Sequence, residues 1–295
     1  MFSQLRSPGG SPSLFSLVVI VGFFLWSFVW AHGGQVSDEE MNACTEQLNQ
    51  IPGLIDLNQL KQVCQQARLR SECKSVLKAP IFHWDYGKGL VHASRKILVM
   101  GLIHGDEPTS GTLARLWLLR LTRIQPRNAW RMIVVSNPDG FRNKTRVNAR
   151  GVDLNRNFPT QDWPELAIEA WEKTTQKNPR RFPGSAPGSE PETQCILAQI
   201  EDFKPDLIVS IHSPYGLVDF DGPKGVQPRL AKLPSKSIGS FPGSLGRLMW
   251  KDRSIPVVTI ELTPGSSLPA WLQDEQLQDV LGDFSKKLPT VEATR

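Results

Sequence analysis

Two histidines and two glutamates carry the chemistry that this sequence suggests most directly. His104 and Glu107 lie close together in the segment GLIHGDE, whereas His212 and Glu261 stand alone farther along the chain. Two imidazoles and one carboxylate form one of the ligand sets of catalytic zinc, which leaves the fourth position for water or substrate. A second carboxylate can then act as the general base on that water. The residue types therefore predict a metallohydrolase.

Three apolar runs would position these side chains. KILVMGLI (96–103) leads to His104, DLIVSI (206–211) leads to His212, and IPVVTI (255–260) leads to Glu261. Such runs predict buried strands, and open α/β sheets place their binding crevices at the carboxyl ends of the strands. Pro108 opens an amphipathic helix directly after Glu107. Taken singly, each residue has an ordinary alternative: a polar loop, a buried histidine bonded to backbone, or a glutamate in solvent.

An arginine-rich segment lies between the two histidines. Residues 145–159 read TRVNARGVDLNRNFP and follow a predicted turn, NPDG, at 137–140. Guanidinium groups bind carboxylates in bidentate fashion, so the segment predicts a loop that holds an anion, with a solvated basic loop as the alternative. Nucleic acid is not expected as a partner, because the arginines are not interleaved with aromatic side chains and form no long basic stripe.

Five segments in this order resemble those of the carboxypeptidase A-like zinc metallopeptidases. They are HGDE (104–107), NPDG (137–140), GVDLNRNFP (151–159), IHS (211–213) and TIEL (259–262). The wording GVDLNRNFP, with PGSLG at 242–246, is most similar to the bacterial murein tripeptide amidase branch, which hydrolyses the γ-D-glutamyl–meso-diaminopimelate bond of cell-wall peptides. The resemblance spans roughly Ile97 to Pro264. It implies an α/β fold with an open, mixed, twisted sheet flanked by helices, and a peptide substrate derived from peptidoglycan.

The resemblance also implies a role for each residue of the site. His104, Glu107 and His212 match the ligands of one Zn²⁺ per chain, and Glu261 matches the general base. Arg146 matches the arginine that polarises the scissile carbonyl, and Asn155 and Arg156 match the pair that binds the terminal carboxylate of the substrate. Asp153 matches the carboxylate that orients a zinc-bound imidazole. On this interpretation the enzyme is a zinc carboxypeptidase or a murein peptide amidase.

The sequence departs from the family pattern at one position. The family usually carries a tyrosine on a loop shortly before the base, but residues 246–250 here read GRLMW, and the chain has only Tyr86 and Tyr215. Tyr215, in IHSPYG, is the candidate substrate-binding replacement. Packing of the pocket wall by Tyr215 is the favoured alternative.

The first residues indicate export. Residues 13–31 (SLFSLVVIVGFFLWSFVWA) are strongly apolar, Arg6 precedes them, and the first twelve residues include no acidic one. This pattern predicts a signal peptide, or a membrane tether through residues 14–31, because the apolar core approaches the ~20 residues that span a bilayer. Ala31 favours cleavage. In either case we expect the catalytic part in the periplasm, or anchored to the inner membrane and facing the periplasm.

The cysteines and the length suggest how the exported part is organised. Cys44, Cys64, Cys73 and Cys195 suit an oxidising compartment, although sequence alone cannot choose their pairing. We expect one disulfide within residues 37–78 and Cys195 as a free buried thiol. Residues 32–79 are predicted to be a small helical extension, with helices beginning near Ser37 and Asp56. Residues 80–295 then form the catalytic domain, with long surface loops at 178–191 and 221–243.

The charge of the chain agrees with an anionic substrate. The net charge of +5 suits an anionic partner such as a wall peptide. Asp219 and Asp221 could contact the free amine at the D-centre of diaminopimelate, although a solvated acidic turn is the favoured interpretation.

An N-acyl amino acid deacylase of the same superfamily is a second hypothesis for the function. A non-catalytic protein that binds wall peptides is a third, and Glu261 argues against it because a binder has no need of a general base.

Overall fold

The computed structural model divides the chain into two compact units, Met1–His32 and Gly33–Arg295. It describes residues 36–87, 95–230, 233–265, 268 and 276–289. The predicted signal peptide or tether at residues 1–31 lies outside the described residues. Within them, no helix has both the length and the apolar character needed to cross a bilayer.

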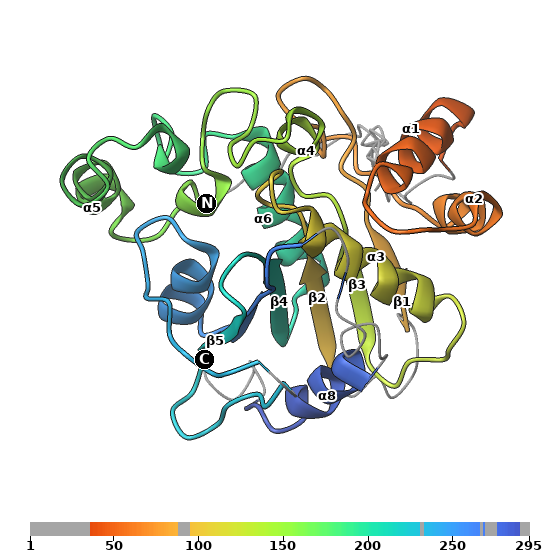
Figure 1. Ribbon diagram of the computed structural model, residues 1–295. Coiled ribbons are helices and arrows are strands. Elements are labelled where there is room, and N and C mark those ends of the chain that lie inside the picture. The colour runs from red at the N-terminus through yellow and green to blue at the C-terminus, as the bar shows by residue number, and fades with distance from the viewer. Residues whose placement is uncertain (1–35, 88–94, 231–232, 266–267, 269–275, 290–295) are drawn as a thin grey trace, which may run out of the picture. The chain divides into compact units, whose positions relative to one another are not determined.

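A mixed sheet of six strands forms the centre of the described part (Figure 1). Its strands, in spatial order, are β1 (Trp84–Tyr86), β3 (Ala129–Ile133), β2 (Lys96–Met100), β4 (Leu207–His212), β6 (Val257–Glu261) and β5 (Leu217–Asp221). The four inner strands are parallel to one another, and the edge strands β1 and β5 are antiparallel to their neighbours. The predicted mixed α/β sheet is therefore confirmed.

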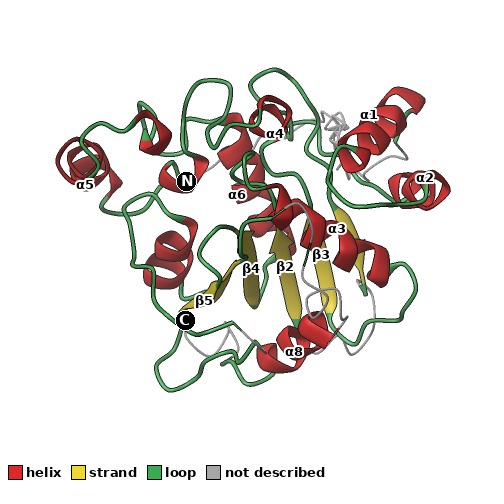
Figure 2. Ribbon diagram, in the orientation of Figure 1, coloured by secondary structure: helices red, strands yellow, loops and turns green. Residues whose placement is uncertain are grey.

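Helices and helical turns connect and cover the strands (Figure 2). Among the described residues, the α-helices are α1 (Asp38–Asn49), α2 (Leu57–Gln65), α3 (Pro108–Leu121), α4 (Pro138–Asn143), α5 (Trp163–Glu169), α6 (Pro191–Phe203) and α8 (Gln276–Ser285). Shorter 3₁₀ turns lie at Leu154–Arg156 and Pro179–Arg181, and π-helical turns at Ala170–Thr174 and Arg247–Asp252.

Both faces of the sheet are buried because its inner strands are apolar at successive positions. In β2, Ile97 and Val99 pack into a core with helices α1, α2, α3 and α8, whereas Leu98 and Met100 pack into a second core with α6. Side chains alternate across a strand, so continuous apolar runs are what two covered faces require. In Figure 1, α3 lies in front of the strands and α6 behind them. This layering leaves the carboxyl ends of the strands available for a site.

The predicted helical extension packs directly on α3, the helix that follows Glu107. Helix α1 begins at a capping box in which Ser37 and Glu40 exchange hydrogen bonds. The buried guanidinium of Arg115, on α3, donates hydrogen bonds to the carbonyl oxygens of Leu48, Ile51, Pro52 and Gly53 at 2.7–3.0 Å. These bonds satisfy carbonyl groups at and beyond the end of α1, which a helix cannot satisfy by itself.

Two disulfides hold the extension in place. Cys44–Cys64 joins α1 to α2, which confirms the disulfide expected within residues 37–78. Cys73–Cys195 joins the extension to α6 across 122 residues of sequence. The prediction that Cys195 is a free thiol was therefore wrong. It failed because the partner is remote in sequence and only the packing of the extension beside α6 brings it close.

The strand predictions differ from the structure at β2 and β5. The run expected to reach Ile103 stops as a strand at Met100, so His104 lies in a turn beyond the strand rather than at its end. The strand β5, at Leu217–Asp221, was not predicted, and it extends one residue into the region expected to be a loop. Alternating Leu, Val, Asp and Phe side chains gave only a weak apolar signal there, because one face of β5 is polar.

Candidate active site

Strands β4 and β6 place His212 opposite Glu261. The two residues are paired in the parallel register at the last position of each strand, and both side chains are buried. The backbone N–H of Leu262 donates to the carbonyl oxygen of His212 at 2.8 Å, which extends the pairing past the strand ends. A candidate ligand and a candidate base thus share one edge of the sheet, as the sequence predicted.

A tight turn after β2 brings His104 and Glu107 to the same edge. The turn passes so near α4 that a Cβ added to Gly105 would lie 2.0 Å from the carbonyl carbon of Gly140, so only glycine fits there. The backbone N–H of Glu107 donates to the carbonyl oxygen of His104 at 3.2 Å, and Pro108 then begins α3. The side chains of His104 and Glu107 consequently point toward each other.

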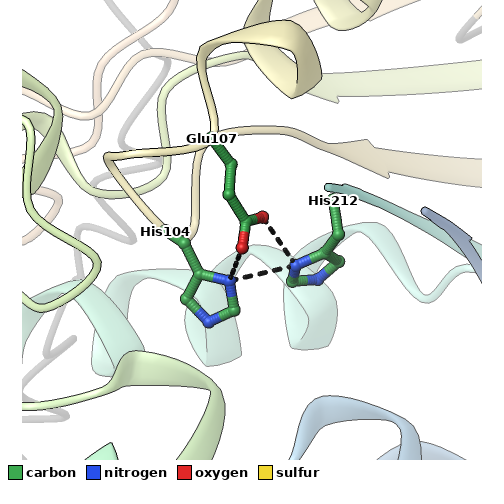
Figure 3. A group of neighbouring side chains, drawn as sticks. All are labelled: His104, Glu107 and His212. Carbon is green, nitrogen blue, oxygen red and sulfur yellow. Dashed lines mark hydrogen bonds and ion pairs between the residues drawn. The ribbon is translucent and has the colours of Figure 1, made fainter. Parts of the chain in front are cut away.

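Three donor atoms converge at this edge (Figure 3). Nδ1 of His104 lies 2.8 Å from Oε1 of Glu107 and 3.1 Å from Nδ1 of His212, and Nδ1 of His212 lies 3.2 Å from Oε2 of Glu107. Among the described residues this is the group of histidine, cysteine or acidic side chains that could hold a metal ion. All three side chains are buried, so the cluster is not an accidental gathering of surface charges.

The donor set fits zinc in both its chemistry and its spacing. Ligand atoms about 2.0–2.1 Å from a tetrahedral Zn²⁺ lie roughly 3.3 Å from one another, close to the separations between these donor atoms. Nδ1 of His104 and Nδ1 of His212 also face each other. If both rings are neutral and both nitrogens present a lone pair, neither can satisfy the other, because a lone pair needs a hydrogen-bond donor or a cation. His104, Glu107 and His212 are therefore the residues that would hold the metal.

The outer ring nitrogens have partners that select the required tautomers. Nε2 of His104 lies 3.1 Å from Oδ1 of Asp153, and Nε2 of His212 lies 2.9 Å from Oγ of Ser210. With the proton on Nε2, each imidazole donates to its oxygen partner and keeps the lone pair of Nδ1 toward the cluster. Such partners orient metal-binding imidazoles and raise their basicity. Asp153 was predicted in this position, but Ser210 was missed, although it precedes His212 by two positions on the same strand face.

Burial and neighbouring charges shift the pKa values of Glu107 and Glu261 in opposite directions. Burial raises the pKa of Glu107, but the charges and hydrogen bonds of His104 and His212 bring it well below its ordinary value, so Glu107 stays ionised. Burial also raises the pKa of Glu261, and the nearby charge of Glu107 adds to that rise, so its pKa lies above the ordinary value. Oε2 of Glu261 is buried without a hydrogen-bond partner among the described residues. A glutamate that stays ionised suits a ligand, and one with raised pKa and an open oxygen suits a base.

Arg146 reaches the metal cluster from the arginine-rich loop. Its Nε donates to Oδ2 of Asp153 at 3.0 Å, and its Nη1 lies 3.4 Å from Oε1 of Glu107. Asp153 is fully buried, and although burial raises its pKa, Arg146 and His104 bring it well below the ordinary value. The guanidinium is held rigidly beside the candidate ligands.

Asn155 and Arg156 follow on a 3₁₀ turn at the other side of the cleft. Oδ1 of Asn155 accepts a hydrogen bond from the backbone N–H of Leu245 at 2.9 Å, which leaves its Nδ2 group for a ligand. The guanidinium of Arg156 lies 4.4 Å from the ring centroid of Phe241. Burial, together with the positive charges of Arg146 and Arg181, lowers the pKa of Arg156 to about 10. Concentrated positive charge in a buried setting favours an anionic ligand such as a carboxylate.

A cleft of about 340 Å³ is lined by every residue predicted to hold the metal, act in catalysis or bind substrate, whereas the predicted orienting residue Asp153 lies buried behind it. Its lining includes the predicted residues His104, Glu107, Arg146, Asn155, Arg156, His212, Tyr215 and Glu261, and also Arg181, Lys236, Phe241 and Gly246. Asp219 and Asp221 line the cleft as well, from strand β5, so the favoured interpretation of these two residues as a solvated acidic turn was wrong. Tyr215 is 57% exposed and borders the cleft. Residues 247–252, where the family tyrosine was sought, form a π-helical turn instead.

Two cleft residues that sequence analysis missed, Arg181 and Phe241, come from the two predicted surface loops. Arg181 lies on the 3₁₀ turn within residues 178–191, and Phe241 lies within residues 221–243. A second arginine near Arg156 was visible in the sequence, but nothing in the spacing connected the two positions. Phe241 carries no signal of its own, because an aromatic residue in a loop has many ordinary explanations.

A buried His–Glu–His cluster, a candidate base at an adjacent strand end and a mixed α/β sheet are the features expected of a zinc metallopeptidase. The family model described as "Zinc carboxypeptidase" matches residues 88–220. With the relatives described next, this match shows that the chain belongs to the zinc carboxypeptidase family, whose members are zinc-dependent metallopeptidases.

Two curated relatives and two solved structures are similar to this chain. Murein peptide amidase A of Escherichia coli (strain K12) is 34% identical over 216 residues, covering 72% of this chain and 78% of the relative. Murein peptide amidase A of Vibrio campbellii is 33% identical over 204 residues, covering 66% of this chain and 79% of the relative. The crystal structure of murein-tripeptide amidase MpaA from Escherichia coli O157 aligns with a TM-score of 0.52 at 26% identity, covering 75% of this chain and 92% of that one. Thrombin activatable fibrinolysis inhibitor aligns with a TM-score of 0.60 at 17% identity, covering 80% and 72%, which shows a shared fold alone.

Proposed function

We propose that this protein is an exported peptidase with one Zn²⁺ per chain that hydrolyses an amide bond in murein peptides. The preferred target is the γ-D-glutamyl–meso-diaminopimelate bond, cleaved as an amidase or a carboxypeptidase would cleave it. The observation that carries this proposal is that the carboxylate-binding pair Asn155 and Arg156 lines the same cleft as the His–Glu–His cluster. The two curated relatives named murein peptide amidase A support the substrate class.

The proposed mechanism follows from the positions of the side chains. His104, Glu107 and His212 would hold the zinc ion. When bound, such an ion lowers the pKa of its water toward about 7 and acts as a Lewis acid. Glu261 accepts the proton of the attacking water at its open carboxylate oxygen and delivers that proton to the departing amine.

Two further groups act on the substrate. Arg146 donates hydrogen bonds to the oxyanion that develops on the scissile carbonyl, and one such donor contributes about 2.7–4 kcal/mol in other enzymes. Asn155 and Arg156 bind the carboxylate of the residue that follows the scissile bond, which fixes the register of the peptide. The amide next to that carboxylate is then the bond that reaches Glu261.

Two disulfides support the proposed export. Cys44–Cys64 and Cys73–Cys195 are both fully buried, and disulfides persist in oxidising compartments such as the periplasm. Murein peptides occur in the same compartment, so the predicted leader at residues 1–31 and the proposed substrate agree.

A direct assay tests this function. Purified full-length protein would be incubated with L-Ala-γ-D-Glu-meso-diaminopimelate, with a chelator, and with the chelator followed by added zinc. We expect free diaminopimelate to appear, to stop with the chelator and to return with zinc, and metal analysis to give one zinc per chain. Zinc binding without release of diaminopimelate would refute the murein substrate. Hydrolysis of N-acetyl amino acids in its place would favour the deacylase hypothesis.

A further inference from the structure

The helical extension lies outside the cleft, because no described residue before His104 lines it. The last segment of the extension, residues 75–77, instead donates hydrogen bonds to side chains of α4 and α6. Helix α4 also contains Gly140, whose backbone touches the turn that presents His104. A segment in this position can support the candidate active site without covering it.

Three donors of this segment bind two buried carboxylates. The hydroxyl of Ser75 donates to Oδ1 of Asp139 at 2.7 Å, and the backbone N–H of Leu77 donates to Oδ2 at 2.9 Å. Between them in the chain, the backbone N–H of Val76 donates to Oε1 of Glu192 at 3.0 Å. Both carboxylates are completely buried, so these donors take the place of water that cannot reach them.

The two carboxylates depend on these donors because they lack a cation. In the described part of the chain, neither Asp139 nor Glu192 forms an ion pair. Burial raises the pKa of Glu192, and the negative charge of Asp139 adds to that rise. The hydrogen bonds from Val76 and Asn148 oppose it. A buried carboxylate that loses one of its donors moves or takes up a proton, because an unsatisfied buried charge is costly.

The other oxygen of Glu192 holds the arginine-rich loop through Asn148. Nδ2 of Asn148 donates to Oε2 of Glu192 at 3.1 Å and to Oε2 of Glu190 at 2.7 Å. With the amide fixed in this way, Oδ1 of Asn148 accepts a hydrogen bond from the backbone N–H of Val152 at 3.0 Å. The contact closes the turn of residues 148–152.

This turn connects two residues that act at the candidate site. Arg146 lies two positions before Asn148, Asp153 follows the turn, and Nε of Arg146 donates to Oδ2 of Asp153 at 3.0 Å. Helix α4 touches the same loop, because a Cβ added to Gly140 would lie 2.6 Å from the carbonyl oxygen of Val147. Both buried carboxylates therefore support the backbone that carries Arg146.

The Cys73–Cys195 disulfide fastens the segment beside Glu192. Cys195 follows Glu192 by three residues on α6, and Cys73 precedes Ser75 by two. Residues three apart are neighbours on a helix surface, so the disulfide and the Val76 contact join the same part of α6 to the extension.

We propose that residues 75–77 are a positioning element that, through Asp139 and Glu192, holds the arginine-rich loop in its catalytic position. The inference rests on the proposed peptidase function. It gives the extension a role in promoting turnover rather than in blocking the cleft. Full turnover then requires the Cys73–Cys195 disulfide, which an oxidising compartment supplies.

Replacement of Ser75 tests the positioning. In zinc-loaded, full-length Ser75→Ala, kcat and KM for L-Ala-γ-D-Glu-meso-diaminopimelate are measured at a temperature where circular dichroism shows the protein folded. We expect kcat to fall by about 10-fold with KM and zinc content unchanged, because a displacement of about 1 Å at a catalytic group can cost up to 10²-fold. Ser71→Ala, at an exposed serine of the same extension, is the matched control and should leave kcat unchanged.

A double-mutant cycle shows whether the effect passes through Arg146. In an Arg146→Met background, Ser75→Ala should cause no further loss of kcat, whereas general loosening of the site would lower kcat again. An unchanged kcat in Ser75→Ala, or an equal loss in both backgrounds, would overturn the inference and leave the peptidase function standing.

The two disulfides provide a second matched pair. The double variant Cys73→Ala/Cys195→Ala should lower kcat by about 10–100-fold, because the segment is no longer fastened beside Glu192. The double variant Cys44→Ala/Cys64→Ala removes a disulfide of the same extension that does not hold residues 75–77, and should keep kcat near that of the unmodified protein. Equal losses of kcat in the two double variants would contradict the proposed role of the segment.

Hydrogen exchange tests the same coupling without a substrate. The backbone N–H groups of Gly151 and Val152 both donate to Asn148, so we expect them to exchange faster in Ser75→Ala than in Ser71→Ala. Unchanged exchange at these two amides would overturn the positioning role. Failure of the unmodified protein to hydrolyse the tripeptide would instead refute the proposed substrate, and the exchange rates would still decide whether residues 75–77 hold the loop.

Discussion

Oδ1 of Asp153 lies 3.1 Å from Nε2 of His104, and the same carboxylate accepts a hydrogen bond from Arg146 through Oδ2. One fully buried side chain thus orients a candidate zinc ligand and positions the arginine proposed to bind the oxyanion. The ligand cluster and the oxyanion group are therefore coupled, and a change at Asp153 should affect metal binding and turnover together.

Replacement of Asp153 tests this coupling. In Asp153→Asn, the partner of His104 loses its charge, and we expect zinc affinity to fall by about 10–100-fold, as is typical when such a partner is removed. Competition with a chromogenic chelator measures the affinity. Ser210→Ala is the matched variant for His212, because it removes the partner of the other imidazole, and it should also weaken binding. Unchanged zinc affinity in both variants would show that these contacts do not tune the metal site.

The two glutamates of the site should separate metal binding from proton transfer. Glu261→Gln removes the proposed base without touching a ligand, so we expect kcat/KM to fall by about 10²–10⁴-fold while the zinc content stays the same. Glu107→Gln should instead lose zinc, because a neutral amide is a poor ligand. Metal analysis and the diaminopimelate-release assay on the same samples distinguish the two results. Loss of zinc from Glu261→Gln would contradict the assignment of Glu261 as the base.

The two disulfides should differ in their contribution to stability. Cross-links restrict the unfolded chain, and the loop-entropy model gives about 5 kcal/mol for Cys73–Cys195 and about 3 kcal/mol for Cys44–Cys64. Their sequence separations are 122 and 20 residues, and all four cysteines are fully buried, so the packing losses on replacement are similar. Denaturant unfolding of the two double Cys→Ala variants measures the difference. Equal losses would show that native-state contacts, rather than loop length, dominate.

Asp221 should make stability depend on pH in a defined range. Its pKa is raised from the ordinary 3.8 to about 6 in the folded protein, so its ionisation disfavours the fold. This penalty is absent below about pH 3.8, grows between pH 3.8 and 6, and is complete above pH 6. We expect Asp221→Asn to unfold at a higher temperature than the unmodified protein at pH 7.5, and the advantage to disappear at pH 4. A difference that does not change with pH would contradict the raised pKa.

Arg115 should determine whether the helical extension stays docked. Its guanidinium donates to four carbonyl oxygens of residues 48–53 and has no carboxylate partner among the described residues. We expect Arg115→Met to lower the free energy of unfolding by about 2–4 kcal/mol, because several buried acceptors lose their donors. Arg123→Met, at an exposed position just after α3, is the control and should cost less than about 0.5 kcal/mol. Similar losses in the two variants would show that the extension is only loosely attached.

The sequence by itself indicated the candidate site residues and three of the four inner strands of the sheet. Apolar runs before His104, His212 and Glu261 predicted inner strands, because a strand covered on both faces needs apolar side chains at successive positions. The order of the short segments around those residues was enough to indicate the family. The disulfide within residues 37–78 followed from the clustering of three cysteines and the expected compartment.

Only the tertiary structure decided several contacts between residues that are remote in sequence. The partner of Cys195, the contact of Ser210 with His212, the Phe241 ring beside Arg156 and the position of Asp221 against Gly246 all join segments whose separation has no period in the sequence. Strand β5 was missed because its cleft face is polar. Only its other face is buried in the core, and the few apolar residues on that face were not enough to predict a strand. Local patterns report local structure, whereas contacts between distant loops depend on how the sheet and its covering helices pack.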